Sequence, residues 1–193
     1  DFNFGDSPFT LSLWIYPTEA VGAFEYFFGY VQNDSAGPWL LGRSSSGNLR
    51  ILMAHPNTWD TNVETGLSLP TNSWSHIVIV RNGTNVYPYV NNSVGATIPN
   101  VDTLGTQATR TLKIGTYGNG EHYQGRVDEV GIWNRALSSA EIASLYVAPA
   151  LGPTAAVTPL NQVCSFNGNT GETSGVEYQK LSILTGGTRF PTC

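Results

Sequence analysis

The chain has 193 residues and a formal net charge of −5, and Lys, Arg, Asp and Glu together make up 12% of it. This length suits one domain with a sizeable core, and the charged fraction is about half of the ~25% usual in soluble domains. The sequence contains no cluster of basic residues, which argues against binding to nucleic acid or to an anionic membrane surface. It also contains no apolar run of about eighteen residues, so we expect no membrane-spanning helix.

The first predicted strand covers residues 8–16. Its apolar residues alternate from Phe9 to Ile15, and Trp14 and Tyr16 fall on the opposite face. Because both faces carry large side chains, we expect a central strand. Further short strands are predicted at residues 23–31, 38–43 and 48–54, separated by polar turns, and this spacing is typical of a β-sandwich.

A β-hairpin is predicted next, from residues 74–81 through Asn82-Gly83 to residues 84–90, because Asn-Gly tolerates the positive φ of a tight turn. Pro88 has no N–H, so it should lie where the ladder needs no donor. Asn91-Asn92 predicts a second turn, which is followed by strands at residues 93–98 and 111–116.

The most informative segment is residues 112–146. Apolar residues at Val127, Val130 and Ile132 predict a strand, and Ser138 followed three residues later by Glu141 is a capping box. The sequence therefore predicts a short helix that begins near Ser139 and ends near residue 146.

Three segments in a fixed order carry a family resemblance. They are Phe9-Thr-Leu-Ser-Leu-Trp-Ile-Tyr-Pro17, Trp74-Ser-His-Ile-Val-Ile-Val-Arg81 and the run from Gly125-Arg-Val-Asp-Glu-Val-Gly-Ile-Trp133 to Tyr146. Together they resemble the laminin-G-like jelly rolls of the concanavalin A-like lectin and glucanase superfamily. The resemblance implies an all-β fold, a two-sheet antiparallel jelly-roll sandwich with one short C-terminal helix near residues 139–146. It also implies that Trp14, Trp74 and Trp133 pack in the core.

The composition changes after residue 147, where a Pro- and Ala-rich stretch begins. We expect a sandwich domain at residues 1–147 and a strap and tail at residues 148–193, which either packs on the sandwich or leads to a neighbouring domain. The tail holds Cys164 and Cys193. A disulfide between them would stabilise by about 3 to 4 kcal/mol, and the alternative is two free buried thiols. Because the chain starts abruptly next to a predicted strand, we expect it to be part of a larger protein.

Two loops combine aromatic side chains with polar groups, which is the chemistry that binds a sugar ring and its hydroxyls. We predict ligand-binding residues in both loops, and we add Arg43, which would line a sheet face beside Tyr30 and Trp39 if that face were open. Trp59 could instead cover an edge of the sandwich, and the second loop could be a simple hairpin connection. The predicted residues of the loops are Trp59, Asp60 and Asn62 in the first and Tyr117, Asn119, Glu121, His122 and Tyr123 in the second.

The resemblance also implies a structural calcium ion. Asp128 is the predicted ligand, because related jelly rolls often hold calcium at the equivalent Val-Asp-Glu-Val segment, and Asp6 or Asp1 could complete the shell. The alternative is that Asp128 caps a turn or pairs with Arg126 or Arg135.

Catalysis is not expected. Glucanases of the superfamily carry a Glu-x-Asp-x-x-Glu triplet, which this chain lacks, and adjacent Asp128 and Glu129 should point to opposite faces of a strand. The sequence therefore predicts a non-catalytic extracellular or cell-surface recognition module that binds a glycan or cell-surface ligand, as in an adhesin joined to other domains. The alternatives are a structural or protein-interaction domain without a sugar site and a polysaccharide lyase or hydrolase.

Overall fold

The computed structural model describes residues 2–32, 35–54, 59–99, 101–105, 110–117 and 121–147, with the backbone alone for residues 32, 35–36, 59–60 and 121. The predicted tail at residues 148–193, with both cysteines, lies outside the described residues, as do Asp1 and Asn119. No helix in the described part is long and apolar enough to cross a membrane.

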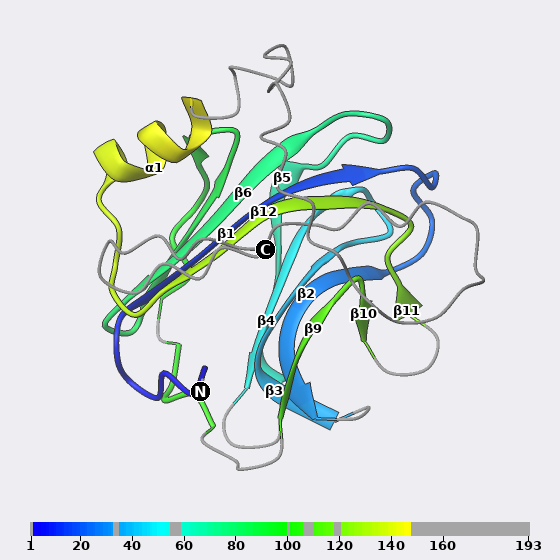
Figure 1. Cartoon of the computed structure of the whole chain (residues 1–193). Coiled ribbons are helices and arrows are strands. Elements are labelled where there is room, and N and C mark those ends of the chain that lie inside the picture. Colours follow the sequence, from blue (N-terminus) through cyan, green and yellow to red (C-terminus); the bar gives the residue numbers. More distant parts are fainter. Residues whose placement is uncertain are drawn as a thin grey trace, which may run out of the picture.

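The architecture is a sandwich of two sheets with one helix against the outside, which confirms the predicted fold (Figure 1). A five-stranded sheet has the order β12-β1-β6-β7-β8. It is built from β1 (Phe9–Pro17), β6 (Ser75–Asn82), β7 (Asn85–Val90), β8 (Ser93–Val94) and β12 (Gly125–Trp133).

A seven-stranded sheet has the order β10-β11-β2-β3-β4-β5, with β9 also paired to β2. It is built from β2 (Glu25–Gln32), β3 (Ser35–Arg43), β4 (Asn48–Ala54), β5 (Trp59–Ser68), β9 (Thr111–Ile114), β10 (Thr116–Tyr117) and β11 (Glu121–His122). Among the described strands, the pairs are antiparallel except for one parallel bridge between His122 and Tyr26.

The core lies between the two sheets and follows from alternation along the strands. On β1, the predicted inward residues are fully buried, and β1 lies centrally between β12 and β6 as its two apolar faces indicated. The largest residues of the core are aromatic or long aliphatic: Phe9, Leu11, Leu13, Ile15, Phe27, Phe28, Trp39, Leu41, Leu49 and Ile51.

The hairpin between β6 and β7 forms one residue later than predicted. Asn82 pairs with Asn85, so the loop is Gly83-Thr84, and Gly83 has the positive φ of 61°. The backbone groups of Pro88 face away from β6, so the ladder with β6 needs no donor there, as expected. The Pro88 carbonyl accepts from the Gly95 N–H at 2.8 Å on the other side of β7. The turn after β7 uses Asn91 and Asn92, both at positive φ, as predicted.

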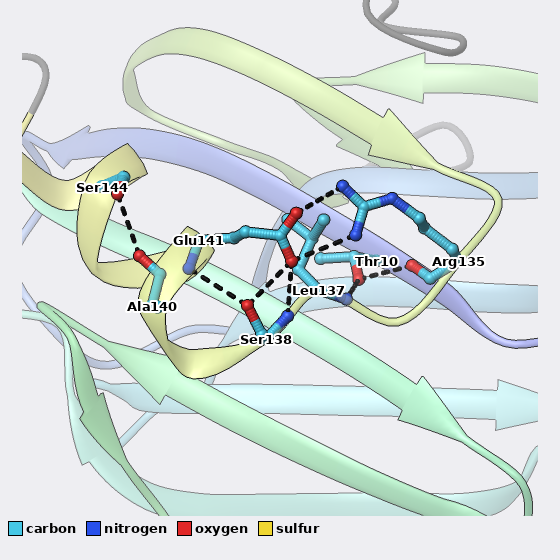
Figure 2. Close-up of polar contacts among 7 residues, drawn as sticks. All are labelled: Thr10, Arg135, Leu137, Ser138, Ala140, Glu141 and Ser144. Atoms are coloured by element: carbon cyan, nitrogen blue, oxygen red, sulfur yellow. Dashed lines mark hydrogen bonds and ion pairs between the residues drawn. The ribbon is translucent and has the colours of Figure 1, made fainter.

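Helix α1 (Ser139–Val147) begins where the capping box places it (Figure 2). The Glu141 carboxylate accepts from the Ser138 N–H at 2.8 Å, and the Glu141 N–H donates to Ser138 Oγ at 3.3 Å. Arg135 forms an ion pair with Glu141 at 2.6 Å. Hydrogen bonds from Arg135, and to a smaller extent from Ser138, lower the pKa of Glu141 to about 2. These contacts fix the direction in which the helix leaves β12.

The inner face of α1 packs on the outer face of the five-stranded sheet. Leu137 and Ile142 are buried against Val78 and Val80 of β6. Thr10 on β1 links the two layers, since its hydroxyl donates to the Arg135 carbonyl at 2.8 Å and accepts from the Leu137 N–H at 3.0 Å (Figure 2). The helix therefore covers one part of this outer face.

A β-bulge interrupts the pairing of β12 with β1. Ser12 pairs with Gly131 and Trp14 with Asp128, so two residues of β12 oppose Leu13 alone, and Glu129 takes a positive φ of 47°. Asp128 and Glu129 are both exposed as a result. The prediction that they point to opposite faces is wrong, because it assumed a regular strand.

Candidate functional site

The first predicted ligand loop is part of a strand. Residues 59–68 form β5 at the edge of the seven-stranded sheet, paired with β4. Trp59 and Asp60 lie on this strand, and their side chains are outside the described set. Asn62 is exposed and pairs with Leu52, on the outer face of the sheet.

Asn62 belongs to a connected group of side chains that we call the Arg50 platform: Phe24, Tyr26, Arg50, Asn62 and Tyr117. Arg50 lies on β4 between the inward residues Leu49 and Ile51, so its side chain emerges on the outer face. Its Nε donates to Asn62 Oδ1 at 2.9 Å, and its Nη1 donates to Tyr26 Oη at 3.1 Å.

Two aromatic rings complete the platform. The guanidinium carbon of Arg50 lies 4.2 Å from the centroid of the Phe24 ring, a cation–π contact, and Phe24 is 41% exposed. Tyr117 on β10 meets Tyr26 edge to face, with centroids 5.4 Å apart. Four strands, β2, β4, β5 and β10, and the residue before β2 thus bring aromatic and polar side chains to one face.

A carboxylate lies beside the platform. Glu64 on β5 pairs with Arg50, and its carboxylate accepts from Ser46 Oγ and from Asn48 Nδ2 at 2.8 Å. These hydrogen bonds lower the pKa of Glu64, with Ser46 the largest contributor. Glu64 is therefore ionised at neutral pH and offers a hydrogen-bond acceptor to a ligand.

The second predicted loop is divided between surface and core. His122 on β11 is exposed, and its Nδ1 lies 3.0 Å from Thr116 Oγ1. Tyr123 is only 8% exposed and packs edge to face on Phe27, and burial raises its pKa. Its predicted role in ligand binding is wrong, because alternation turns the neighbour of an outward residue inward. Glu121 is paired with Tyr117 through β11, and its side chain is not described.

Arg43 does not line an open face. It is 1% exposed and forms a buried ion pair with Glu25 at 3.1 Å, while its Nη2 donates to Thr71 Oγ1 at 2.6 Å. Tyr30 and Trp39, its expected companions, belong to the core between the sheets. Trp39 and Arg43 do share one face of β3, but that face is the inner one.

Two of the predicted calcium ligands, Asp6 and Asp128, lie far apart. Asp6 is exposed and lies 3.8 Å from Arg81, which pairs with Phe9 at the start of β1, whereas Asp128 pairs with Trp14. Phe9 and Trp14 are about 16 Å apart along an extended strand, so Asp6 and Asp128 cannot share one ion. Asp128 Oδ1 instead accepts from the Glu129 N–H at 2.8 Å, which is the alternative of a local cap. Within the described ranges, no three His, Cys, Asp or Glu side chains gather into a metal site. Calcium binding by Asp128 with other ligands stays a prediction.

Sequence reasoning missed three members of the platform: Phe24, Tyr26 and Arg50. Phe24 and Tyr26 alternate with inward residues of β2, and Arg50 alternates with Leu49 and Ile51. This alternation was visible in the sequence and could have placed all three on one face, but the order of the strands was needed to bring them beside Asn62 and Tyr117.

The fold and this face define a two-layer β-sandwich of the lectin type. A scan of family models matches residues 1–143 to Laminin_G_3, described as the Concanavalin A-like lectin/glucanases superfamily. The chain belongs to this family. No curated protein sequence matches the chain significantly.

Solved structures share the fold at low sequence identity. Domain 4 of AbnA, a GH43 extracellular arabinanase from Geobacillus stearothermophilus, was solved in complex with arabinotriose and matches with a TM-score of 0.58 at 20% identity, over 74% of this chain and 67% of that one. A heptameric SAP-like pentraxin from Limulus polyphemus matches with a TM-score of 0.55 at 19% identity, over 74% and 70%. Trypanosoma rangeli sialidase matches with a TM-score of 0.55 at 20% identity, over 76% of this chain but 23% of the enzyme. At these identities the likeness is one of fold.

Proposed function

We propose that this domain is a non-catalytic recognition module that binds a glycan on the Arg50 platform. The observation that carries the proposal is the contact of one guanidinium with an exposed aromatic ring and with the amide of Asn62. A sugar ring has an apolar face that stacks on an aromatic side chain, and its hydroxyls need donors and acceptors at its edge. Phe24 offers the ring, and Asn62 and Glu64 offer the polar groups.

The platform is ordered before a ligand arrives. Arg50 is held by three partners, so its long side chain loses little conformational freedom on binding. Tyr26 is 5% exposed and is fixed from the side by Tyr117. Such an arrangement lowers the entropic cost of ordering the protein when a ligand binds.

The ionisation of the site supports binding over hydrolysis. A glycosidase needs one carboxyl group with a raised pKa to donate a proton to the leaving oxygen. Glu64, the carboxylate beside the platform, has a lowered pKa and keeps its charge. It can accept a hydrogen bond from a sugar hydroxyl but is a poor proton donor at neutral pH.

The wider setting is part of the proposal. The domain of AbnA complexed with arabinotriose has this fold within an extracellular arabinanase. We infer that the present domain works outside the cell or at its surface, joined to other domains of the same protein. The low charge and the abundant surface turns of the sequence agree with that setting.

The test is a glycan array that includes arabino-oligosaccharides, probed with the unsubstituted chain and with Phe24→Ala. Loss of the Phe24 ring should weaken glycan binding about tenfold, which corresponds to ~1.4 kcal/mol. Val94→Ala is the matched control, because Val94 is 58% exposed on the other sheet.

Binding that is equal for the chain and for Phe24→Ala would contradict the Arg50 platform. A folded chain that binds no glycan but captures a purified protein partner would favour a protein-interaction domain. Release of reducing sugar from mixed polysaccharides, abolished by Glu129→Gln, would establish a hydrolase at the Asp128–Glu129 pair.

A further inference from the structure

The five-stranded sheet carries a second exposed aromatic group, at the end of β1. Trp74, just before β6, is 38% exposed and lies against Tyr16, with ring centroids 5.5 Å apart. The family resemblance implied that Trp74 packs in the core, and the structure shows this to be wrong. Two strand positions before Tyr16, Trp14 stacks on Tyr146 of α1, so Tyr16 shares the outer face that the helix covers in part.

Arg126 faces this group from β12, where it pairs with Tyr16. Its guanidinium carbon lies 5.4 Å from the centroid of the Tyr16 ring. The other arginines of the described chain all have polar or electrostatic partners: Arg43, Arg50, Arg81, Arg110 and Arg135. Arg126 has no side-chain hydrogen bond or ion pair among the described residues, so its donors are available to a ligand.

Asp128 lies next along the same side of β12, opposite Trp14. One carboxylate oxygen accepts from the Glu129 N–H, and the other has no hydrogen bond among the described residues. Glu129 is also exposed because of the bulge. Its pKa is raised, first by partial burial and second by the negative charge of Asp128. The two carboxyl groups are therefore close enough to interact.

These residues form what we call the Trp74 cluster: Tyr16, Trp74, Arg126 and Asp128. Arg126 can only donate hydrogen bonds and an ionised Asp128 can only accept them. A pair of neighbouring hydroxyls on a sugar both donates and accepts, and the apolar face of the ring can stack on Trp74. The two acidic side chains oppose a carboxylated or sulfated sugar.

We propose that the Trp74 cluster is a second carbohydrate site, which takes a neutral sugar ring with adjacent free hydroxyls. The cluster lies on the outer face of the five-stranded sheet, whereas the Arg50 platform lies on the outer face of the seven-stranded sheet. The two sites share no residue. The domain would thus hold two segments of a neutral polysaccharide, or two chains, and gain avidity without a second domain. The inference stands or falls independently of the platform.

The experiment is affinity electrophoresis in native gels that contain arabinan, xylan, β-glucan or galactan. Four variants are compared with the unsubstituted chain: Trp74→Ala, Trp74→Phe, Phe24→Ala and the double variant Phe24→Ala with Trp74→Ala. Val94→Ala is the control for an exposed apolar residue on the same sheet. Circular dichroism and the melting temperature establish that each variant is folded.

The proposal predicts that Trp74→Ala lowers the affinity for at least one polysaccharide about tenfold, while Trp74→Phe retains most of it. The double variant should lose the retardation that either single variant keeps. An effect of Trp74→Ala with none from Phe24→Ala would support the Trp74 cluster and remove the platform. Equal retardation of Trp74→Ala and the unsubstituted chain in every gel, or no retardation of the chain at all, would overturn the second site.

Discussion

Acid should weaken this fold through one buried histidine. His76 on β6 is 1% exposed and packs against the rings of Trp14 and Tyr146, with centroid distances of 4.9 and 6.0 Å. Its Nε2 is 2.9 Å from Ser12 Oγ, and its Nδ1 has no partner in the described structure. Burial lowers the pKa of His76 from 6.5 to about 4.

The sign of the effect follows from proton binding. Between the folded pKa of about 4 and the unfolded value of 6.5, the unfolded chain binds more protons at this residue, so stability falls as the pH drops through this window. When the unfolded chain binds one proton more than the folded chain, the free energy of unfolding falls by ~1.4 kcal/mol for each pH unit of acidification. The contribution of His76 is complete above pH 6.5, about 2 kcal/mol smaller at about pH 5, and about 3 kcal/mol smaller near pH 4.

The assay is urea denaturation at about pH 7.5 and 5.0, for the unsubstituted chain and for His76→Phe. Phenylalanine keeps an aromatic ring against Trp14 and Tyr146 and cannot titrate. Groups common to both proteins contribute equally, so the difference between their losses isolates His76. We expect the unsubstituted chain to lose about 2 kcal/mol more than the variant. Equal losses would refute the claim that His76 is neutral and desolvated beneath α1.

Four further substitutions test the fold by urea denaturation at neutral pH. Arg43→Met leaves Glu25 buried without its cation and should lower the free energy of unfolding by about 3 to 5 kcal/mol. Arg135→Met breaks an exposed pair and should lower it by at most about 1 kcal/mol. Similar losses for the two variants would mean that Arg43 is not buried. Glu129→Gly relieves a positive φ and should gain up to about 1 kcal/mol, and a loss would argue against the bulge. Ser138→Ala removes the helix cap and should cost about 1 kcal/mol, and an unchanged midpoint would contradict the capping box.

Much of the fold was predictable because the strongest signals are local. Alternation on β1 and the capping box at Ser138 each depend on a few neighbouring residues, and both were confirmed. Strand β5 was missed because it is a half-exposed edge strand, in which Val63 and Leu67 are the only aliphatic residues among polar ones. The bulge at Glu129 was missed because nothing about a glutamate indicates a positive φ.

Only part of the candidate site could be predicted, because its residues come from strands that are far apart in the sequence. Asn62 and Tyr117 were selected for their chemistry, and they lie on the platform. Arg50 was passed over, although it holds the group together, because its partners come from β2 and β5. Arg43 and Tyr123 were selected for side-chain type alone, and the structure turns both inward. Residue type indicates what a side chain can bind, but the order of strands in the sheet determines what it meets.

A glycan bound over the outer face of the seven-stranded sheet should perturb the residues of that face. The most direct measurement is a titration of the ¹⁵N-labelled domain with the strongest glycan of the array, followed by two-dimensional NMR of the backbone amides. We expect the largest shift changes at Phe24, Arg50, Asn62 and Tyr117, and we expect Phe24→Ala to need about tenfold more glycan for the same changes. Changes confined to the five-stranded sheet and α1, with none at these four residues, would contradict it.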